Sequence, residues 1–329
     1  MLRYVLKRLI WVIPVMLGVL VIVFTITYFT PGDPVMAILG TNYSPENYEM
    51  LAHEMGLDRP FHEQLWSYFW NLVTKLDLGK SFSTNISVSS EIANRFPVTL
   101  RIGLLSIFVT LLLGLPLGIF SAIRQYSVLD TSLTTFALIL AAVPNYVLAL
   151  VTIIIFGVRL KWLPITGLDS IKSWILPIAA NSLAGVAVIT RMTRTTMLEV
   201  IRQDYIRTAR AKGQKEGIVI RRHALTNCLI PIVTSVSGQM AHVMAGSIIV
   251  ETIFSIPGMG MYMRAGIASR DYAAINGSVL LLSFVVCMLN LLVDIVYAFI
   301  DPRIKAQYES RNKKMKSIRK VLPENAEVA

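Results

Sequence analysis

The sequence predicts an all-α polytopic membrane protein with six transmembrane helices. Of its 329 residues, 54% are apolar and 16% carry charge, whereas soluble globular domains carry about 25% charged residues. The mean hydropathy is +0.61. Long stretches without formal charge recur along the chain between short basic or turn-rich segments. Stretches of this kind have the length that a helix needs to cross a bilayer.

Residues 1–32 are expected to form an uncleaved N-terminal anchor helix. Arg3, Lys7 and Arg8 precede a charge-free stretch from Leu9 to Gly32, which is longer than the apolar core of a signal peptide. The motif P-G-D-P follows at residues 31–34 and is a helix stop, because proline cannot donate a backbone hydrogen bond. The basic flank favours a cytoplasmic N-terminus.

Residues 33–99 are expected to form a large extracytoplasmic loop or cap, because they are polar and contain helical patterns of their own. The string L-G-K-S at residues 78–81 is similar to the end of a phosphate-binding loop, but Thr74 occupies the place of the required first glycine. We therefore reject a nucleotide site. His53 and His62 have no neighbouring ligands at a metal-binding spacing, so no metal site is expected.

Residues 100–304 are expected to hold the other five spans. Apolar runs predict these spans within residues 102–123, 131–158, 174–191, 228–250 and 273–300. Pro144 and Asn145 interrupt the third span and predict a kink that faces the protein interior, where neighbouring groups can satisfy the freed carbonyls. Residues 305–329 are polar and basic, and we expect a disordered cytoplasmic tail.

The distribution of charge predicts the orientation of the chain. The net charge is +11, with basic residues that flank the apolar runs; this favours anionic membrane lipid, and not nucleic acid, as a partner. Six spans place both termini on one side. The segments then assigned to the cytoplasm hold 21 Lys or Arg residues against 10 in the external loops, so both termini are expected to be cytoplasmic in a bacterial plasma membrane.

Residues 191–227 form the most charged loop of the predicted core. Nine Lys or Arg residues and three acids lie between Arg191 and Arg222, and the runs on either side carry no formal charge. Asp204 is expected to cap a short helix over Tyr205–Lys212. Gly213 is expected to end this helix in the left-handed conformation.

Strings in this loop resemble a known family. D-Y-I-R-T-A-R-A-K-G occupies residues 204–213, and R-H-A-L-T-N-C-L-I-P occupies residues 222–231. With P-G-D-P, V-E-T-I-F-S-I-P-G at residues 250–258 and N-L-L-V-D-I-V-Y-A-F-I-D-P-R-I at residues 290–304, they resemble permeases of binding-protein-dependent ABC importers, in the dipeptide, oligopeptide and nickel branch. The long loop after the first span resembles the B-type subunit of that branch.

The loop departs from the general permease pattern. R-T-A at residues 207–209 replaces E-A-A, and Pro231 lies five residues later than the general spacing would put it. The peptide branch shares this departure. The basic Arg207 cannot make the contacts of a glutamate, so the resemblance leaves the contacts on the ATPase open.

The resemblance implies a type I ABC importer permease fold with a cytoplasmic coupling helix between the fourth and fifth spans. It implies a homologous second permease subunit, two ABC ATPase subunits and an extracytoplasmic solute-binding protein as partners. ATP and Mg²⁺ would be used by the ATPases, so we expect no catalytic residue, cofactor or metal in this chain. The residues implied to couple to the ATPases are Asp204, Tyr205, Arg207, Thr208, Ala209, Arg210, Ala211, Lys212, Gly213, His223, Ala224, Leu225, Asn227 and Pro231.

Several alternatives stay open at this point. Di- and oligopeptides are the expected cargo, with chelated nickel or glutathione-like conjugates as alternatives. A secondary transporter is a more distant alternative, because no internal repeat is visible in the sequence. Glu251 and Asp294 lie near the ends of spans and each should find a partner inside the bundle or in water, while His242 is expected to be a packing residue.

Overall fold

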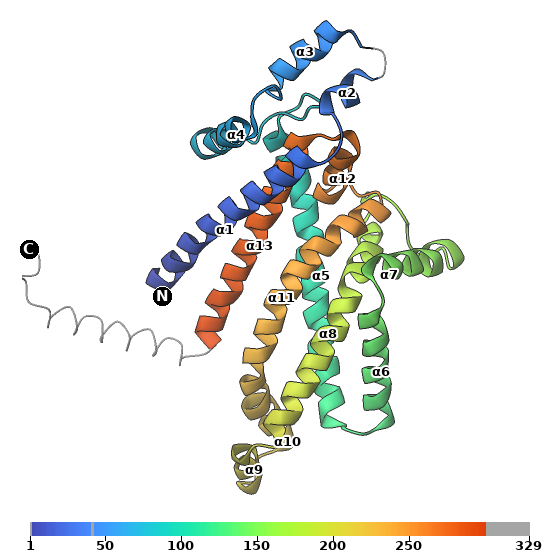
Figure 1. Ribbon diagram of the computed structural model, residues 1–329. Helices are drawn as coiled ribbons and strands as arrows, with labels where there is room; N and C mark the ends of the chain where they lie inside the picture. The colour runs from blue at the N-terminus through green and yellow to red at the C-terminus, as the bar shows by residue number, and fades with distance from the viewer. Residues whose placement is uncertain (1, 41–42, 301–329) are drawn as a thin grey trace, which may run out of the picture.

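The computed structural model describes residues 2–40 and 43–300, so the tail expected over residues 305–329 lies outside the described residues. Within these residues the chain is helical, with one isolated antiparallel bridge between Lys80 and Ser87. Five long helices run through the molecule (Figure 1). They are α1 (Leu2–Phe29), α5 (Val88–Ile123), α8 (Ile175–Ile201), α11 (Leu225–Ile253) and α13 (Tyr272–Ile300).

The third expected span is broken. Helix α6 (Val128–Ala142) and helix α7 (Asn145–Thr152), which continues as η1 (Ile153–Arg159), meet at an angle of 107°. Val143 has an extended backbone because a residue before proline is disfavoured in the helical conformation. The expected kink at Pro144 is therefore a full break. Five helices of the described chain can each span a membrane, and this bent pair makes a sixth candidate.

Two helices extend beyond the ranges that hydropathy predicted. Helix α5 begins at Val88, so the expected start at Ile102 and the boundary between residues 99 and 100 both lie inside it. Helix α8 continues to Ile201, well past the expected end near Arg191. Apolar composition marks only the part of a helix that lies in hydrocarbon, and polar residues can prolong the same helix into water.

Glycines allow α5 and α8 to pack closely along the centre of the bundle. A Cβ atom placed on Gly118 would lie 2.5 Å from the Cβ of Thr193 and 2.6 Å from the carbonyl oxygen of Thr190. Gly114 meets Ile189 in the same way, one turn earlier. Small residues at such crossings let helix backbones approach each other in a membrane, where dispersion contacts replace the hydrophobic drive.

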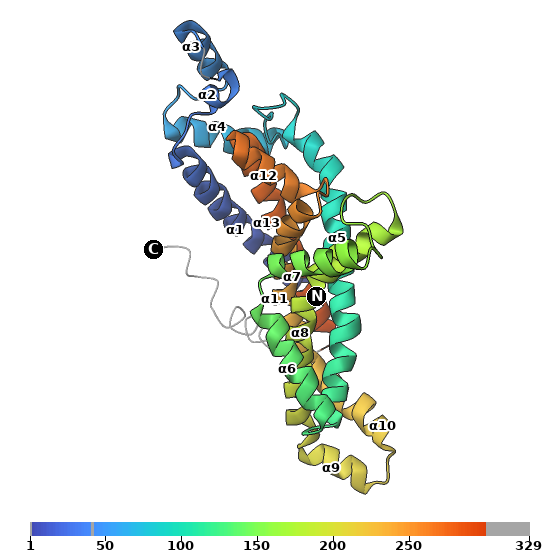
Figure 2. The same ribbon diagram turned by 90° about the vertical axis from the view of Figure 1, so that its right-hand side faces the viewer.

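Helix α1 lies beside α13 (Figures 1 and 2), and polar contacts join the two helices near both ends. Arg8 forms an ion pair with Asp294 at 2.8 Å, and the Thr27 hydroxyl donates a hydrogen bond of 3.2 Å to Asn276. The expected partner of Asp294 is thus an arginine of the first span.

The remaining helices lie at the two ends of the bundle. Helices α2 (Pro34–Leu39), α3 (Pro45–Glu54) and α4 (Phe61–Lys75) lie at one end, next to α12 (Met259–Ser269). Helices α9 (Asp204–Ala211) and α10 (Glu216–Ile218) lie at the opposite end (Figure 2). The two loops singled out in the sequence are therefore separated by the length of the bundle.

Candidate functional site

Helix α9 begins shortly after α8 ends. Gln203 occupies the N-cap position, with an extended backbone at φ −71° and ψ 149°, and its carbonyl accepts hydrogen bonds from the N–H groups of Ile206 and Arg207. Asp204 is the first helical residue and caps nothing, which corrects the expectation. Its carboxylate lies 3.8 Å from Arg207 on the exposed surface, where it still complements the positive end of the helix dipole.

Gly213 ends α9 as expected. Its φ is +74°, and its N–H donates a 2.9 Å hydrogen bond to the carbonyl of Arg210. No atom lies within 4 Å of a Cβ placed on this residue. The requirement for glycine is therefore conformational and not steric, because only glycine adopts this region at low cost.

The two faces of α9 differ sharply. Ile206 and Ala209 are buried, 0% and 7% exposed, and lie on the same face because residues three apart are neighbours on a helix. They join a cluster of buried residues from α5, α8, η3 (Val219–Ala224) and α11: Ala122, Ile189, Met197, Val219, Ala224, Cys228, Ile232 and Val236. The exposed residues are Asp204, Tyr205, Arg207, Thr208, Arg210, Ala211 and Lys212. A short charged helix is thus anchored to the bundle by two apolar side chains.

The chain returns from α9 to α11 through a network of polar contacts. Arg210 donates two hydrogen bonds to the carboxylate of Glu216, at 3.1 and 2.6 Å. The His223 ring lies 2.8 Å from the side-chain oxygen of Gln214, and the Asn227 amide donates to the carbonyl of His223 at 2.7 Å. These contacts join the two strings singled out in the sequence, residues 204–213 and 222–231, to the segment that connects them.

The remaining residues that were predicted to couple to the ATPases lie at the end of η3 and in α11. Ala224 is fully buried at the end of η3, and Leu225 is half-buried at the start of α11. Pro231 lies inside α11, near the apolar cluster that holds Ile206. Ile206 was not among the predicted residues. It is the one large aliphatic residue between residues 204 and 213, and this could have indicated that it anchors the helix to the bundle.

An ion pair near this loop was also missed. Arg194 of α8 donates hydrogen bonds of 2.6 and 2.8 Å to the two carboxylate oxygens of Asp130. The Ser121 hydroxyl and the Tyr126 N–H also donate to Asp130, whose exposed fraction is 2%. The pair ties the turn between α5 and α6 to α8, about two turns before α8 ends.

Buried carboxylates also join elements at the opposite end of the bundle. Glu251 is 0% exposed and accepts a 2.6 Å hydrogen bond from the N–H of Gly260 in the first turn of α12. Asp271 accepts hydrogen bonds from the hydroxyls of Ser81 and Ser83 and from the N–H of Ala274. The partner expected for Glu251 is therefore a helix N-terminus, which favours an anion.

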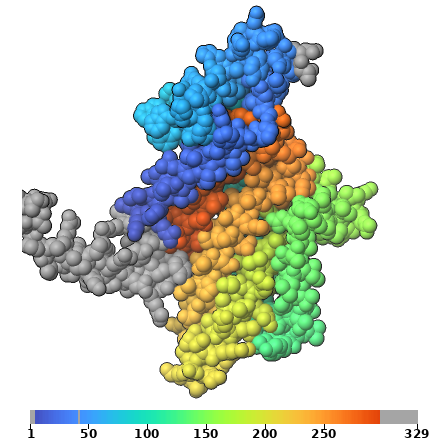
Figure 3. All heavy atoms as spheres, viewed as in Figure 1, coloured from blue at the N-terminus to red at the C-terminus, as the bar shows by residue number. Residues whose placement is uncertain are grey.

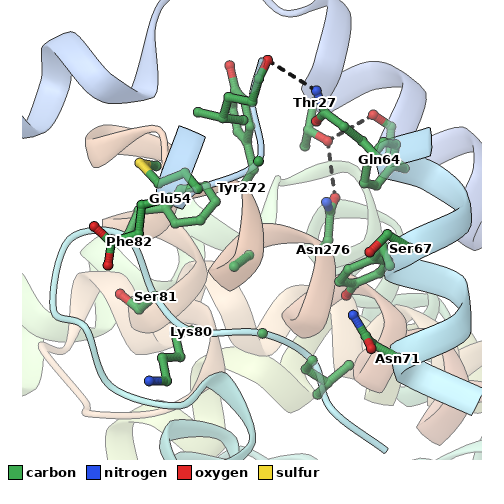
Figure 4. A pocket seen from close by; sticks show the side chains of 18 of the residues that line it. Thr27, Glu54, Gln64, Ser67, Asn71, Lys80, Ser81, Phe82, Tyr272 and Asn276 are labelled. Atoms are coloured by element: carbon green, nitrogen blue, oxygen red, sulfur yellow. Dashed lines mark hydrogen bonds between the residues drawn. The ribbon is translucent and has the colours of Figure 1, made fainter. Parts of the chain in front are cut away.

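A cavity of about 770 Å³ with a mixed polar and apolar lining lies between α1, α2, α3, α4, α13 and the segment before α5. Figure 4 shows Gln64, Ser67 and Asn71 of α4 on one side of it, with Lys80 and Ser81 on the other. Thr27 and Asn276, which join α1 to α13, also line this cavity.

Two family models match the chain. Residues 114–306 match the family described as binding-protein-dependent transport system inner membrane component. Residues 1–103 match the N-terminal domain of the same membrane components. Together the two matches take in both the segment of α1–α4 and the bundle that carries α9.

Relatives match over nearly their whole length. A putative peptide transport system permease protein of Brucella abortus is 40% identical over 92% of this chain and 98% of its own. The dipeptide transport system permease protein DppB of Alkalihalophilus pseudofirmus is 38% identical, over 93% of this chain and all of its own. The glutathione transport system permease protein GsiC of Escherichia coli is 38% identical over 93% of this chain and 99% of its own.

A solved structure has the same fold. An inward-facing structure of the MetNI methionine ABC transporter aligns with a TM-score of 0.56 at 19% identity. The alignment covers 64% of this chain and 96% of the solved one.

Proposed function

Because the chain belongs to the family of binding-protein-dependent transport system inner membrane components, we propose that it forms half of the translocation pathway for di- and oligopeptides. It is a multi-pass inner membrane protein and the permease subunit of an ABC importer. The peptide cargo rests mainly on one observation: relatives named as peptide and dipeptide permeases match more than nine tenths of this chain.

The partners follow from the class of transporter. A component of a binding-protein-dependent system works with a solute-binding protein and with ATPase subunits. In the proposed assembly, a homologous second permease supplies the other half of the pathway. Two ATPase subunits bind ATP and Mg²⁺, while this chain contributes no cofactor and no catalytic group.

The geometry of α9 supports its role as the coupling element. Its exposed face offers Tyr205, Arg207 and Lys212 to an ATPase surface, and its buried residues Ile206 and Ala209 lie in one apolar cluster with residues of α8, η3 and α11. A displacement of α9 would therefore be transmitted to two spans through the packed side chains of this cluster. Such an arrangement transmits motion through packed elements and needs no chemistry in this chain.

Glutathione is the second candidate cargo, because a glutathione permease matches at 38% identity. Reconstitution of the whole importer in liposomes tests both the function and the cargo. We expect ATP-dependent uptake of labelled dipeptide that requires the solute-binding protein. Uptake driven by an ion gradient without the ATPases would contradict the importer function. The solute-binding protein can also be tested alone by calorimetry. If it binds glutathione or a nickel chelate but no short peptide, the order of the cargoes is reversed.

We further propose that both termini and α9 are cytoplasmic, and that the segment of α2–α4 is extracytoplasmic. Cysteines introduced at Gln214 and at Asn85 test this orientation, because both residues lie in loops outside the long helices. An impermeant maleimide added to cells with a permeable outer membrane should modify position 85 and spare position 214. The opposite pattern would invert the proposed topology.

Gly213→Val is expected to lower uptake steeply while the chain still inserts. The left-handed conformation costs a β-branched residue on the order of 1 to 2 kcal/mol, and relief of that strain would redirect α9. Gly217→Val is the matched control, because Gly217 is also exposed with open space around it but does not have a positive φ. ATP-driven uptake and ATPase retention are measured for both variants. Equal uptake in the two variants would show that the direction of the chain at Gly213 is unimportant.

A further inference from the structure

Helix α4 separates the 770 Å³ cavity from apolar clefts. It contributes the polar residues Gln64, Ser67 and Asn71 to the lining of that cavity. Its other side borders two clefts of about 490 and 260 Å³. The residues that α4 contributes to these clefts are His62, Leu65, Trp66, Phe69, Leu72 and Val73. A helix with one polar and one apolar face is suited to the plane where membrane meets water.

Two spans complete the larger cleft. Its walls include Ile13 and Leu17 of α1 and Phe284 of α13, whose exposed fractions are 60%, 41% and 45%. Helix α1 has a mean hydropathy of 2.9 over its most apolar window, and little of that window is buried inside the protein. The cleft is therefore continuous with the exposed apolar surface of α1, and Figure 3 shows α4 lying against the upper side of α1.

Aromatic side chains on α4 have the arrangement of an interfacial helix. Trp66 and Trp70 are 62% and 54% exposed, and their rings stack with centroids 6.0 Å apart. Phe61 packs against Tyr28 and Phe29 at the end of α1. Tryptophan is enriched where hydrocarbon meets the hydrated headgroups, whereas exposure of these rings and of the cleft to water would be unfavourable.

We propose that α4 lies in the extracytoplasmic membrane interface and that the cleft between α1, α4 and α13 holds an acyl chain of a membrane phospholipid. The apolar lining accepts hydrocarbon and offers little to a polar ligand. The continuity of the cleft with the spans selects lipid over a soluble partner. The lipid would fix α4 on α1 and so position the 770 Å³ cavity that lies on the other side of α4.

Two cysteine substitutions on α4 test its placement, in a chain whose native Cys228 and Cys287 are replaced by alanine. Val73→Cys lies on the cleft side and Asn71→Cys on the cavity side. In the assembled importer in membranes, an impermeant maleimide should modify position 71 at least about tenfold faster than position 73, because hydrocarbon excludes the charged reagent. Val73 is 58% exposed in the isolated chain, so its own fold does not protect it. Absence of this difference overturns the proposal.

A photoreactive lipid identifies the occupant. Phosphatidylglycerol with a diazirine in one acyl chain should crosslink to cleft residues of α4 in the reconstituted importer. Leu17→Trp should fill the cleft and reduce this crosslinking several-fold, while crosslinking at Ile22, an exposed residue of α1 outside the cleft lining, stays unchanged. Crosslinking of position 73 to the second permease subunit and not to lipid would assign the cleft to that protein and overturn the proposal.

Discussion

Arg194→Ala is expected to destabilise the chain by roughly 3 to 5 kcal/mol, because it leaves a buried charge without its partner. The side chain of Asp130 is 3% exposed, and the two hydrogen bonds from Arg194 satisfy both of its oxygens. Only the Ser121 hydroxyl, the Tyr126 N–H and a long contact with Thr134 would remain. The loss is measured by the concentration of denaturing detergent at which half of the chain is unfolded, and by the amount of chain found in the membrane.

Two further variants separate this pair from general effects on α8. Arg191→Ala removes an exposed arginine from the same helix and should change the stability by no more than about 0.5 kcal/mol. The double variant Asp130→Asn with Arg194→Gln should recover much of the loss, because neutral amides replace both charges. If the double variant is as unstable as Arg194→Ala, the loss comes from packing and not from an unpaired carboxylate.

Ala209→Glu is expected to reduce uptake close to background. Ala209 is 7% exposed and packs in the apolar cluster with Ile206, so a glutamate there must either bury its charge or pull α9 away from this cluster. Burial of an unpaired charge costs far more than α9 can recover from its two anchoring residues. The expected consequence is an importer whose ATPases no longer move the spans.

Ala211→Glu is the matched control for this substitution. Ala211 lies on the exposed face of the same helix and receives the same change in size and charge. Limited proteolysis of the loop should show faster cleavage in Ala209→Glu and no change in Ala211→Glu, while retention of the ATPases reports on binding at the exposed face. Wild-type uptake and proteolysis in Ala209→Glu would show that this cluster does not hold α9.

The sequence by itself determined the class of protein, most of its spans and the location of α9. These features depend on neighbouring residues: a charge-free run long enough for a bilayer, as in α1 or α13, and a short polar helix before Gly213. The family strings also lie within short windows of the chain. Local composition and backbone preference are enough for such features, since hydrocarbon forces each span to satisfy its own backbone hydrogen bonds.

Only the tertiary structure decided which side chains meet. Asp130 and Arg194 are 64 residues apart in the sequence, and the packing of α6 on α8 brings them together. The inward direction of Ile206 and Ala209 depends on how α9 is rotated against the bundle. Apolar patterning cannot supply this information in a membrane protein, because lipid-facing and buried surfaces are both apolar and small residues and polar pairs select the packing.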